Sequence, residues 1–303
     1  MMTVKPSLSL VLLSGTALLL SSCGESEPDP ASSRFARTDA LLSQVAENVE
    51  AEAVVTQIDH ARLAAEQGVE MPPAVVTFFL DGASSATLLE ANRKVGLDLP
   101  HRVLCYEEVD GDTGKVSFAS GDFLSQRHGL GELAGLADYD ATMTKALAAV
   151  PAEAQFPVTG EGVSEGFGIV EMTSTFGFQE TIERLKFAVL GQGDTVWFGE
   201  VDFQEVAGQH DVEIPPSVLL LFGGPGPGGQ AMKTAPRLGL DAFCQKLLVL
   251  EDSDSGEVTI YFNRITDFAK LHYGTSTPPQ QMIDQRLEAT FSQAVSLTET
   301  TVD

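Results

Sequence analysis

The chain has 303 residues, and 43% of them are hydrophobic, so it can bury cores large enough for two ordinary domains. Its formal net charge is −25 at pH 7, with 43 acidic and 18 basic residues. Such a surface repels nucleic acid and anionic lipid, and we therefore expect no nucleic-acid partner and no membrane contact through a basic patch.

The first 22 residues have the layout of a secretory signal. A short cationic stretch ends at Lys5, an uncharged apolar segment spans 8–20, and small residues then lead to Cys23. The apolar segment is shorter than the roughly 20 residues of a membrane-spanning helix, so we expect it to be removed. Residues 20–23 (LSSC) resemble the lipobox of bacterial lipoproteins, which implies cleavage before Cys23 and lipidation of its sulfur. The alternative is an ordinary secretory signal with an incidental cysteine.

Residues 24–33 (GESEPDPASS) are acidic and rich in proline and serine, a composition that buries too little apolar surface to fold. With Cys23 they predict a flexible tether over 23–33. Each buried methylene of an acyl chain such as palmitate contributes about 0.8 kcal/mol, so lipid on Cys23 can anchor the chain to a membrane without a spanning helix. The absence of aspartate after the cysteine resembles Gram-negative lipoproteins sent to the outer membrane. We expect a protein of the cell envelope there, facing the periplasm or the surface.

The segment behind the tether shows a first copy of a helix and strand pattern. One extended run ends at Asp59, a second spans 74–80, and a third at 102–106 is also strand-like. Residues 110–114 (DGDTG) are a turn by composition. A helix carrying His128 and an amphipathic helix near 133–148 close the copy.

The second copy has the same order of elements. The pattern predicts a helix at 178–192, a strand at 195–202, a short helix at 203–210, a strand at 217–222, a glycine and proline loop, a helix at 229–237, strands at 246–251 and 257–262 around the turn 252–256, a helix carrying His272, and a helix at 278–295. Short strands joined by hairpins, with helices able to cover one face, predict an α+β two-layer sandwich and not a doubly wound parallel sheet.

Four landmarks recur at one offset of 143 residues, which indicates a tandem duplication. They are Asp59 with Asp202, Pro72-Pro73 with Pro215-Pro216, Gly96-Leu97-Asp98 with Gly239-Leu240-Asp241, and Glu108 with Glu251. His272 follows His128 at 144. We therefore predict a first domain at 34–150, a linker at 151–163 and a second domain at 164–303.

Several of these segments together resemble the DUF302 family, whose function is unknown. They are Ile58-Asp59-His60, Pro72-Pro73, residues 96–100 (GLDLP) and 127–130 (RHGL) in the first copy, and Asp202, Pro215-Pro216, residues 239–241 and His272 in the second, with residues 180–185 (ETIERL) matching the family's opening helix. The resemblance covers most of the chain behind the tether. It implies a TATA-binding-protein-like arrangement, with helices packed on one face of an antiparallel sheet, and brings no established activity.

The second copy departs from the pattern in two places. Asp202-Phe203 stands where the first copy has Asp59-His60, and Leu271-His272-Tyr273 where it has Arg127-His128-Gly129. The second copy has lost polar residues that the first retains, so we expect any site to lie in the first domain.

The candidate catalytic residues are Asp59, His60 and His128. A carboxylate that fixes one imidazole nitrogen leaves the other free as a base or a metal ligand, and His60 and His128 are the metal-ligand candidates. In the second copy, Asp202 and His272 are the candidate ligand-binding residues. The alternative interpretation is structural: Asp59 caps the short helix behind it, and His128 bonds near a helix end that Gly129 terminates.

Two other features carry less chemistry. Residues 223–229 (GGPGPGG) lie between a strand and a helix, where an anion cradle could form, but they lack the lysine and the serine or threonine of a P-loop, and we expect a flexible loop. Cys105 and Cys244 could pair in an oxidising compartment, although we favour buried free thiols. The chain contains no GxSxG, CxxC or CxxCH motif, and no cofactor is indicated.

These observations favour a non-catalytic envelope lipoprotein. We expect its two domains to form an intramolecular pseudo-dimer that binds a small ligand or another envelope protein. The alternative is a metal-dependent or His/Asp-using enzyme with its site in the first domain. A third interpretation, packing alone, predicts that no cleft gathers the polar candidates.

Overall fold

The structure, a computed structural model, describes residues 30–297. The predicted signal at 1–22 and the lipidation of Cys23 lie outside the described residues, as does most of the predicted tether. Its last residues, 30–33, belong instead to the first helix, which begins at Pro30. Within the described range, no helix is both long and apolar enough to cross a membrane.

The first domain, which we define as 30–158, alternates helices and strands. Its elements are α1 (Pro30–Ala46), η1 (Ala51–Ala53), β1 (Val54–Asp59), α2 (His60–Glu66), β2 (Ala74–Phe79), α3 (Gly82–Ala91), η2 (Arg93–Leu97), β3 (His101–Glu107), β4 (Gly114–Ala119), α4 (Gly121–His128), α5 (Ala134–Ala146), η3 (Ala152–Ala154) and β5 (Gln155–Val158).

The second domain, 169–297, repeats most of this order. It contains β6 (Ile169–Ser174), α6 (Phe178–Leu190), β7 (Val196–Asp202), α7 (Phe203–Gly208), β8 (Ser217–Gly223), α8 (Pro225–Met232), η4 (Pro236–Gly239), β9 (Gln245–Glu251), β10 (Val258–Asn263), α9 (Ile265–Tyr273) and α10 (Pro278–Val295). The α+β class with two tandem domains, predicted from the sequence, is confirmed.

Each domain contains one five-stranded sheet. The first has the order β1-β2-β3-β4-β5 and the second β7-β8-β9-β10-β6. All neighbouring pairs are antiparallel except β4 and β5, which are parallel. The fifth place is filled differently in the two domains: β6 precedes its sheet in the chain, whereas β5 comes from the segment predicted as a linker.

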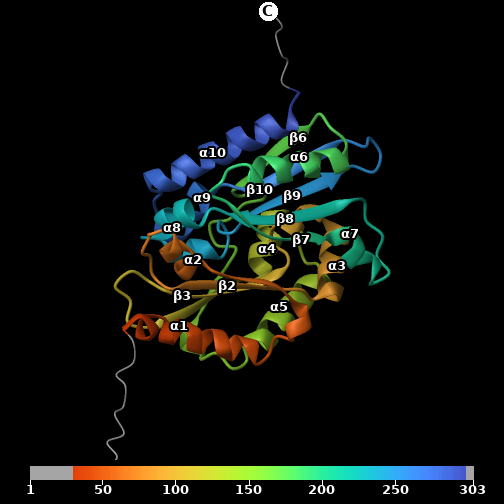
Figure 1. Cartoon of the computed structure of the whole chain (residues 1–303). Coiled ribbons are helices and arrows are strands. Elements are labelled where there is room, and N and C mark those ends of the chain that lie inside the picture. The colour runs from red at the N-terminus through yellow and green to blue at the C-terminus, as the bar shows by residue number, and fades with distance from the viewer. Residues whose placement is uncertain (1–29, 298–303) are drawn as a thin grey trace, which may run out of the picture.

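The two sheets lie one above the other, with helices on their outer sides (Figure 1). Helix α1 packs on the first sheet, and α6 and α10 pack on the second. The central strands β2 and β8 are therefore covered on both faces, and every residue of each is buried. This explains why both read as continuous apolar runs and not as alternating patterns.

The glycine and proline segment is not a loop. Residues 225–232 form α8, whereas the predicted helix was 229–237. Proline is tolerated in the first turn of a helix, where its missing N–H has no intrahelical acceptor, so Pro225 begins the helix instead of preventing it. Gly229 lets α2 approach closely, because a Cβ there would lie 2.6 Å from the Cβ of Ala64.

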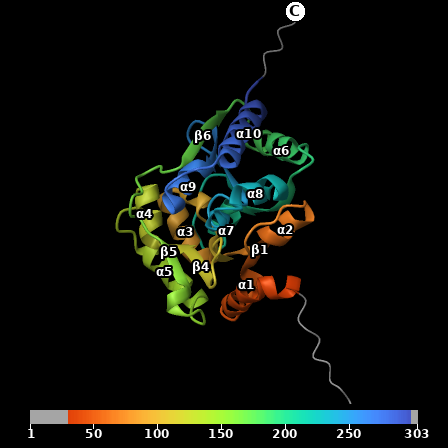
Figure 2. The ribbon, with the colours of Figure 1, turned by 90° about the vertical axis from the view of Figure 1, so that its left-hand side faces the viewer.

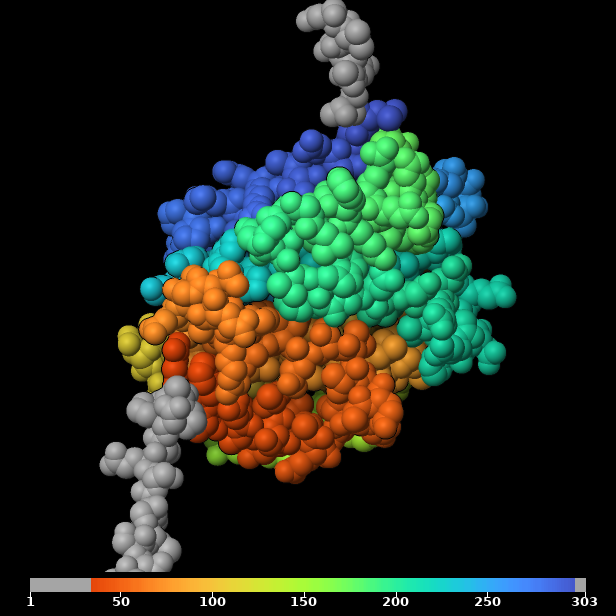
Figure 3. Space-filling view, in the orientation of Figure 1, coloured from red at the N-terminus to blue at the C-terminus, as the bar shows by residue number. Residues whose placement is uncertain are grey.

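The domains contact each other through reciprocal pairs of elements. Helix α2 packs against α8 and α3 against α7, while η2 packs on β9 and η4 on β3 (Figure 2). In the space-filling view the two domains meet along a broad seam (Figure 3). Buried apolar side chains of both domains belong to one cluster, so the core continues across the seam.

Two glycines explain why the Gly-Leu-Asp segment occurs twice. A Cβ on Gly96 would lie 2.8 Å from the ring of Phe203, and a Cβ on Gly239 would lie 3.0 Å from the ring of His60. Each glycine thus permits a close approach of the opposite domain's short helix.

Both described cysteines are free and buried, as the favoured interpretation of the sequence predicted. Burial raises the pKa of the Cys105 thiol and of the Cys244 thiol to about 12. Both are therefore protonated near pH 7 and behave as small apolar groups.

Candidate functional site

A group of fully buried charged side chains lies between the two domains. Arg102, on β3, donates from Nη2 to Asp98 Oδ1 at 2.7 Å and to Asp241 Oδ1 at 2.6 Å. Its Nε also donates to the carbonyl of Leu240 at 2.8 Å. Because Asp98 and Asp241 belong to different domains, this one guanidinium joins both halves of the molecule.

Arg127, at the end of α4, is the second buried arginine of this group. Its Nη1 donates to Asp98 Oδ2 and its Nη2 to Asn263 Oδ1, both at 2.6 Å. Asn263 in turn donates to the backbone carbonyl of Asp241 at 2.8 Å. We call Asp98, Arg102, Arg127 and Asp241 the charge centre; the side chains of all four have no exposed surface.

A histidine binds each aspartate of the charge centre. His128 Nε2 lies 2.6 Å from Asp98 Oδ2, and His272 Nε2 lies 3.0 Å from Asp241 Oδ2. These pairs are equivalent in the two copies. The missed signal was that the Gly-Leu-Asp segments repeat at almost the same offset as the histidines, which predicts that each aspartate partners the histidine of its own copy.

The Asp98–His128 pair has a defined protonation. Burial alone would raise the pKa of Asp98, but Arg127, Arg102 and His128 together hold it well below its usual value. Burial lowers the pKa of His128, although Asp98 opposes this. The imidazole is therefore neutral at pH 7, and its one proton sits on Nε2 because the carboxylate oxygen can only accept. Nδ1 carries a lone pair and has no partner among the described atoms.

Lys246, on β9, also lies close to the charge centre. Its side chain is buried, its Nζ has no hydrogen-bond partner among the described atoms, and burial lowers its pKa to about 7. Val103 occupies the equivalent position in the first copy, so this lysine could not be found from the repeat.

A pocket of about 180 Å³ lies beside His128. It is lined by Asn92, Lys94, Arg127, His128, Glu165, Gly166, Ile169 and Glu171. The Asn92 amide holds one wall by donating to the His128 carbonyl at 2.9 Å. The other wall is the connection between the domains, which is fixed where the Gly166 N–H donates to the Arg127 carbonyl at 2.9 Å.

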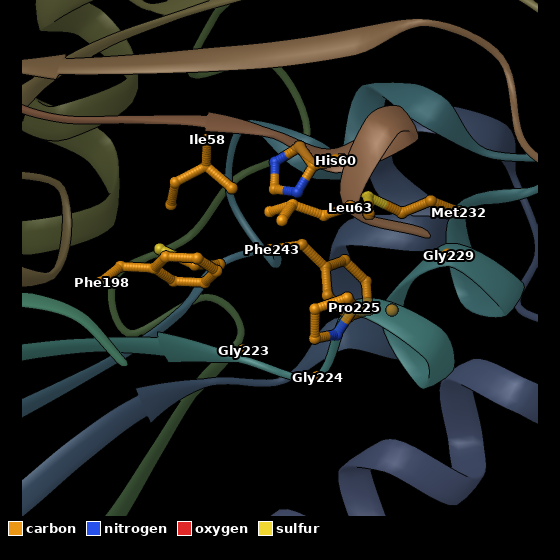
Figure 4. A pocket seen from close by; sticks show the side chains of 12 residues that line it. Ile58, His60, Leu63, Phe198, Gly223, Gly224, Pro225, Gly229, Met232 and Phe243 are labelled. Atoms are coloured by element: carbon orange, nitrogen blue, oxygen red, sulfur yellow. The ribbon is translucent and has the colours of Figure 1, made fainter. Parts of the chain in front are cut away.

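His60 lies in a different pocket, between α2 of the first domain and α8 of the second (Figure 4). This pocket has a volume of only about 20 Å³ and is lined mainly by apolar side chains and glycines. Burial lowers the pKa of His60 to about 4, and its Nε2 has no partner among the described atoms. Since one water needs roughly 10–15 Å³ of such volume, this pocket has room for a single water.

The aspartates predicted to orient the histidines cap helices instead. Asp59 Oδ1 accepts from the Arg62 N–H at 2.8 Å at the start of α2, and Asp202 Oδ1 accepts from the Glu205 N–H at 3.0 Å at the start of α7. The structural interpretation of Asp59 is therefore confirmed. Gly129, with φ of 63°, ends α4 as expected.

The structure places Asp59, His60 and His128 at three separate positions: a helix cap, the small interdomain pocket and the charge centre. In the described part of the chain, no three His, Cys, Asp or Glu side chains gather as metal ligands. Of the second-copy candidates, Asp202 is a cap and His272 binds Asp241. The residues that the sequence missed are Asp98 and Asp241 as histidine partners, and Arg102 and Lys246.

The fold and the charge centre define a tandem α+β protein in which two equivalent domains share one polar interface. The domain of unknown function DUF302 matches residues 30–150 and 170–294, so the chain belongs to this family and carries its domain twice.

Among curated proteins, 80 residues of the chain are 40% identical to fluoride-specific ion channel FluC 1 of Brucella suis, and the same identity holds for FluC 1 of Brucella abortus and FluC 2 of Brucella melitensis. The match covers 26% of this chain and 28–30% of those proteins, so the chain spans less than a third of their length. A solved structure of an uncharacterized conserved DUF302 protein from Bacillus stearothermophilus is 19% identical, with a TM-score of 0.36, and the match covers 42% of this chain and 95% of that one.

Proposed function

We propose that this protein is an exported, lipid-anchored envelope protein that binds a small polar ligand in the pocket beside His128. The observation that carries the proposal is a buried imidazole held by Asp98 whose Nδ1 has no partner among the described atoms, in a pocket large enough for more than water. Buried polar atoms in proteins nearly always have a hydrogen-bond partner, so an unpartnered atom beside a pocket indicates a missing partner.

We further propose that the two domains act as an intramolecular pseudo-dimer. The support is the reciprocity of their contacts, α2 with α8 and α3 with α7, which is the pattern of a two-fold interface. The ligand pocket lies where the first domain meets the start of the second, so the pairing supplies both of its walls.

Thermal unfolding with a ligand panel tests the binding proposal. The panel contains amines, hydroxylated metabolites, carboxylates, phosphate and fluoride, the last because relatives are named fluoride-specific channels. A bound ligand raises the unfolding temperature by mass action. We expect a shift in the wild type that is lost in His128→Gln, which keeps a donor for Asp98 but removes Nδ1. The matched control His272→Gln changes the equivalent pair and should retain the shift. No shift with any compound would contradict the proposal.

The lipid anchor is tested separately. Cells grown with an alkyne analogue of palmitate should label the wild-type protein at the mature N-terminus, and Cys23→Ser should abolish both the label and membrane fractionation. Labelling that persists in Cys23→Ser would contradict the proposal.

A second candidate function is an enzyme that uses His128 as a general base. An imidazole oriented by a carboxylate on one nitrogen, with the other free, is the arrangement of a catalytic His–Asp pair. Mass spectrometry of the ligand after incubation separates the two functions. A binding protein returns the ligand unchanged, whereas an enzyme converts it in the wild type and not in His128→Gln.

A further inference from the structure

We infer that the ligand of the His128 pocket is a small organic cation with N–H donors, of the size of a primary alkylammonium or an amino alcohol. This inference rests on the function proposed above and adds the chemical class of the ligand. Three independent features of the pocket carry it: the hydrogen-bonding state of the imidazole, the charges that remain unpaired, and the volume.

The imidazole can only accept a hydrogen bond from a ligand. Asp98 Oδ2 lies 2.6 Å from His128 Nε2 and 2.6 Å from Arg127 Nη1, and a carboxylate flanked by two arginines stays ionised. The Nε2 proton is thus committed to Asp98, and Nδ1 presents a lone pair. A carboxylate or a phosphate would place its own lone pairs against it, whereas an ammonium or hydroxyl donates to it.

The cations that line the pocket already have anionic partners. Arg127 binds Asp98, and Lys94 Nζ lies 3.3 Å from a Glu171 carboxylate oxygen and 4.9 Å from the ring centroid of Tyr261. Neither is left with a full positive charge to offer an anion.

One carboxylate of the pocket is different. Glu165 is exposed, and its carboxylate lies directly over Gly129, the residue after His128: a Cβ on Gly129 would be 2.9 Å from Glu165 Cδ. None of the ion pairs among the described residues includes it. Glu165 and the neutral imidazole therefore present an anion and an acceptor from adjacent positions, and the net charge of −25 adds a field of the same sign.

The volume restricts the size of this cation. About 180 Å³ is below the roughly 300–1,000 Å³ of pockets that bury drug-sized ligands, so the ligand has only a few heavy atoms. A bare metal ion is a poorer fit, because the described residues provide no cluster of three metal ligands there or elsewhere.

The experiment is isothermal titration of the full-length protein, purified in detergent, with ethanolamine hydrochloride and methylammonium chloride, and in parallel with sodium acetate and sodium phosphate. We expect an amine to bind the wild type. Its affinity should fall about tenfold or more in His128→Gln and in Glu165→Gln, since a hydrogen bond to a charged group is lost in each. His272→Gln should leave it unchanged. Glu165 is exposed, so its variant reports on the site even if His128→Gln fails to fold.

Three results would overturn the inference. If acetate or phosphate binds in a manner that depends on His128 and the amines do not, the pocket is a ligand site but the class is wrong. If the amines bind equally well to wild type, His128→Gln and Glu165→Gln, they are attracted by the acidic surface and not by the pocket. If none of the four probes binds and the wider panel produces no shift that depends on His128, the inference and the proposed function fail together.

Discussion

Among single residues, His101 gives the clearest prediction of pH dependence. It is buried on β3, its ring stacks on Tyr139 with centroids 4.3 Å apart, and neither ring nitrogen has a partner among the described atoms. Burial lowers its pKa to about 4. Between pH 6.5 and 4 the unfolded chain binds this proton and the folded protein does not, so the stability contributed by the neutral ring falls as pH falls.

We predict that His101→Phe keeps the stacking and reduces this loss. From the pKa values of 6.5 unfolded and about 4 folded, the wild type should lose about 2 kcal/mol more than the variant between pH 7 and pH 5. Urea unfolding at both pH values measures the difference. His210→Gln, at an exposed position, is the control and should follow the wild type. Parallel pH profiles for wild type and His101→Phe would contradict the prediction.

Arg102 is the residue on which the charge centre depends most. Its guanidinium joins Asp98 and Asp241, and the side chains of all three have no exposed surface. Arg102→Met removes the cation from two buried carboxylates, and breaking a buried pair in this way costs about 3–5 kcal/mol. Chemical denaturation measures the free energy of unfolding. The control is Arg286→Met, whose half-exposed pair with Asp194 should contribute about 0–1 kcal/mol. Equal effects of the two substitutions would refute the assignment.

Among the structural elements, the ends of α4 and α9 offer a matched comparison. Gly129 and Gly274 end these equivalent helices with φ of 63° and 73°. Alanine at either position pays for the left-handed conformation, roughly 1–2 kcal/mol. Gly274 has open space around it, whereas the Glu165 carboxylate covers Gly129. We therefore expect Gly129→Ala to weaken ligand binding as well as stability, and Gly274→Ala to lower stability alone. Titration and thermal unfolding of both variants check this.

The elements also show what the sequence could and could not predict. Continuous apolar runs predicted the central strands β2 and β8, and a glycine after His128 predicted the end of α4, because these signals are local. The burial of Arg102 was not predictable from its strand, since it depends on Asp241 of the other domain. The same holds for α8, whose glycines are poor helix formers by themselves but allow close contact with α2.

The candidate site was predicted in part for the same reason. His128 was identified from its residue type and position, but Asp59 was chosen as its partner over Asp98. Asp59 is adjacent to His60 in the sequence, whereas Asp98 reaches His128 only because the 3₁₀ helix η2 ends beside the last turn of α4. The repeat contained the correct pairing, since Asp98 and Asp241 keep nearly the same spacing to the histidines of their own copies.

For the whole molecule, the continuous core and the shared charge centre imply that neither domain is complete alone. We predict that two separate chains, residues 30–158 and 159–297, associate one to one when they are produced together. The interface would close over Gly96 and Gly239, and Arg102 would again bind Asp241 across it. Analytical ultracentrifugation and the ratio of the two chains in the purified complex measure this association.

The charge centre should also control the strength of that association. Truncating one partner of a buried, hydrogen-bonded charge pair at an interface costs about 2–5 kcal/mol, so Arg102→Met in the first chain should weaken the complex by about 30-fold or more. Arg286→Met in the second chain is the control, because its partner Asp194 lies in the same chain. If the two chains remain monomeric at micromolar concentration, or if Arg102→Met binds as tightly as the wild type, the domains are merely tethered neighbours and the pseudo-dimer proposal fails.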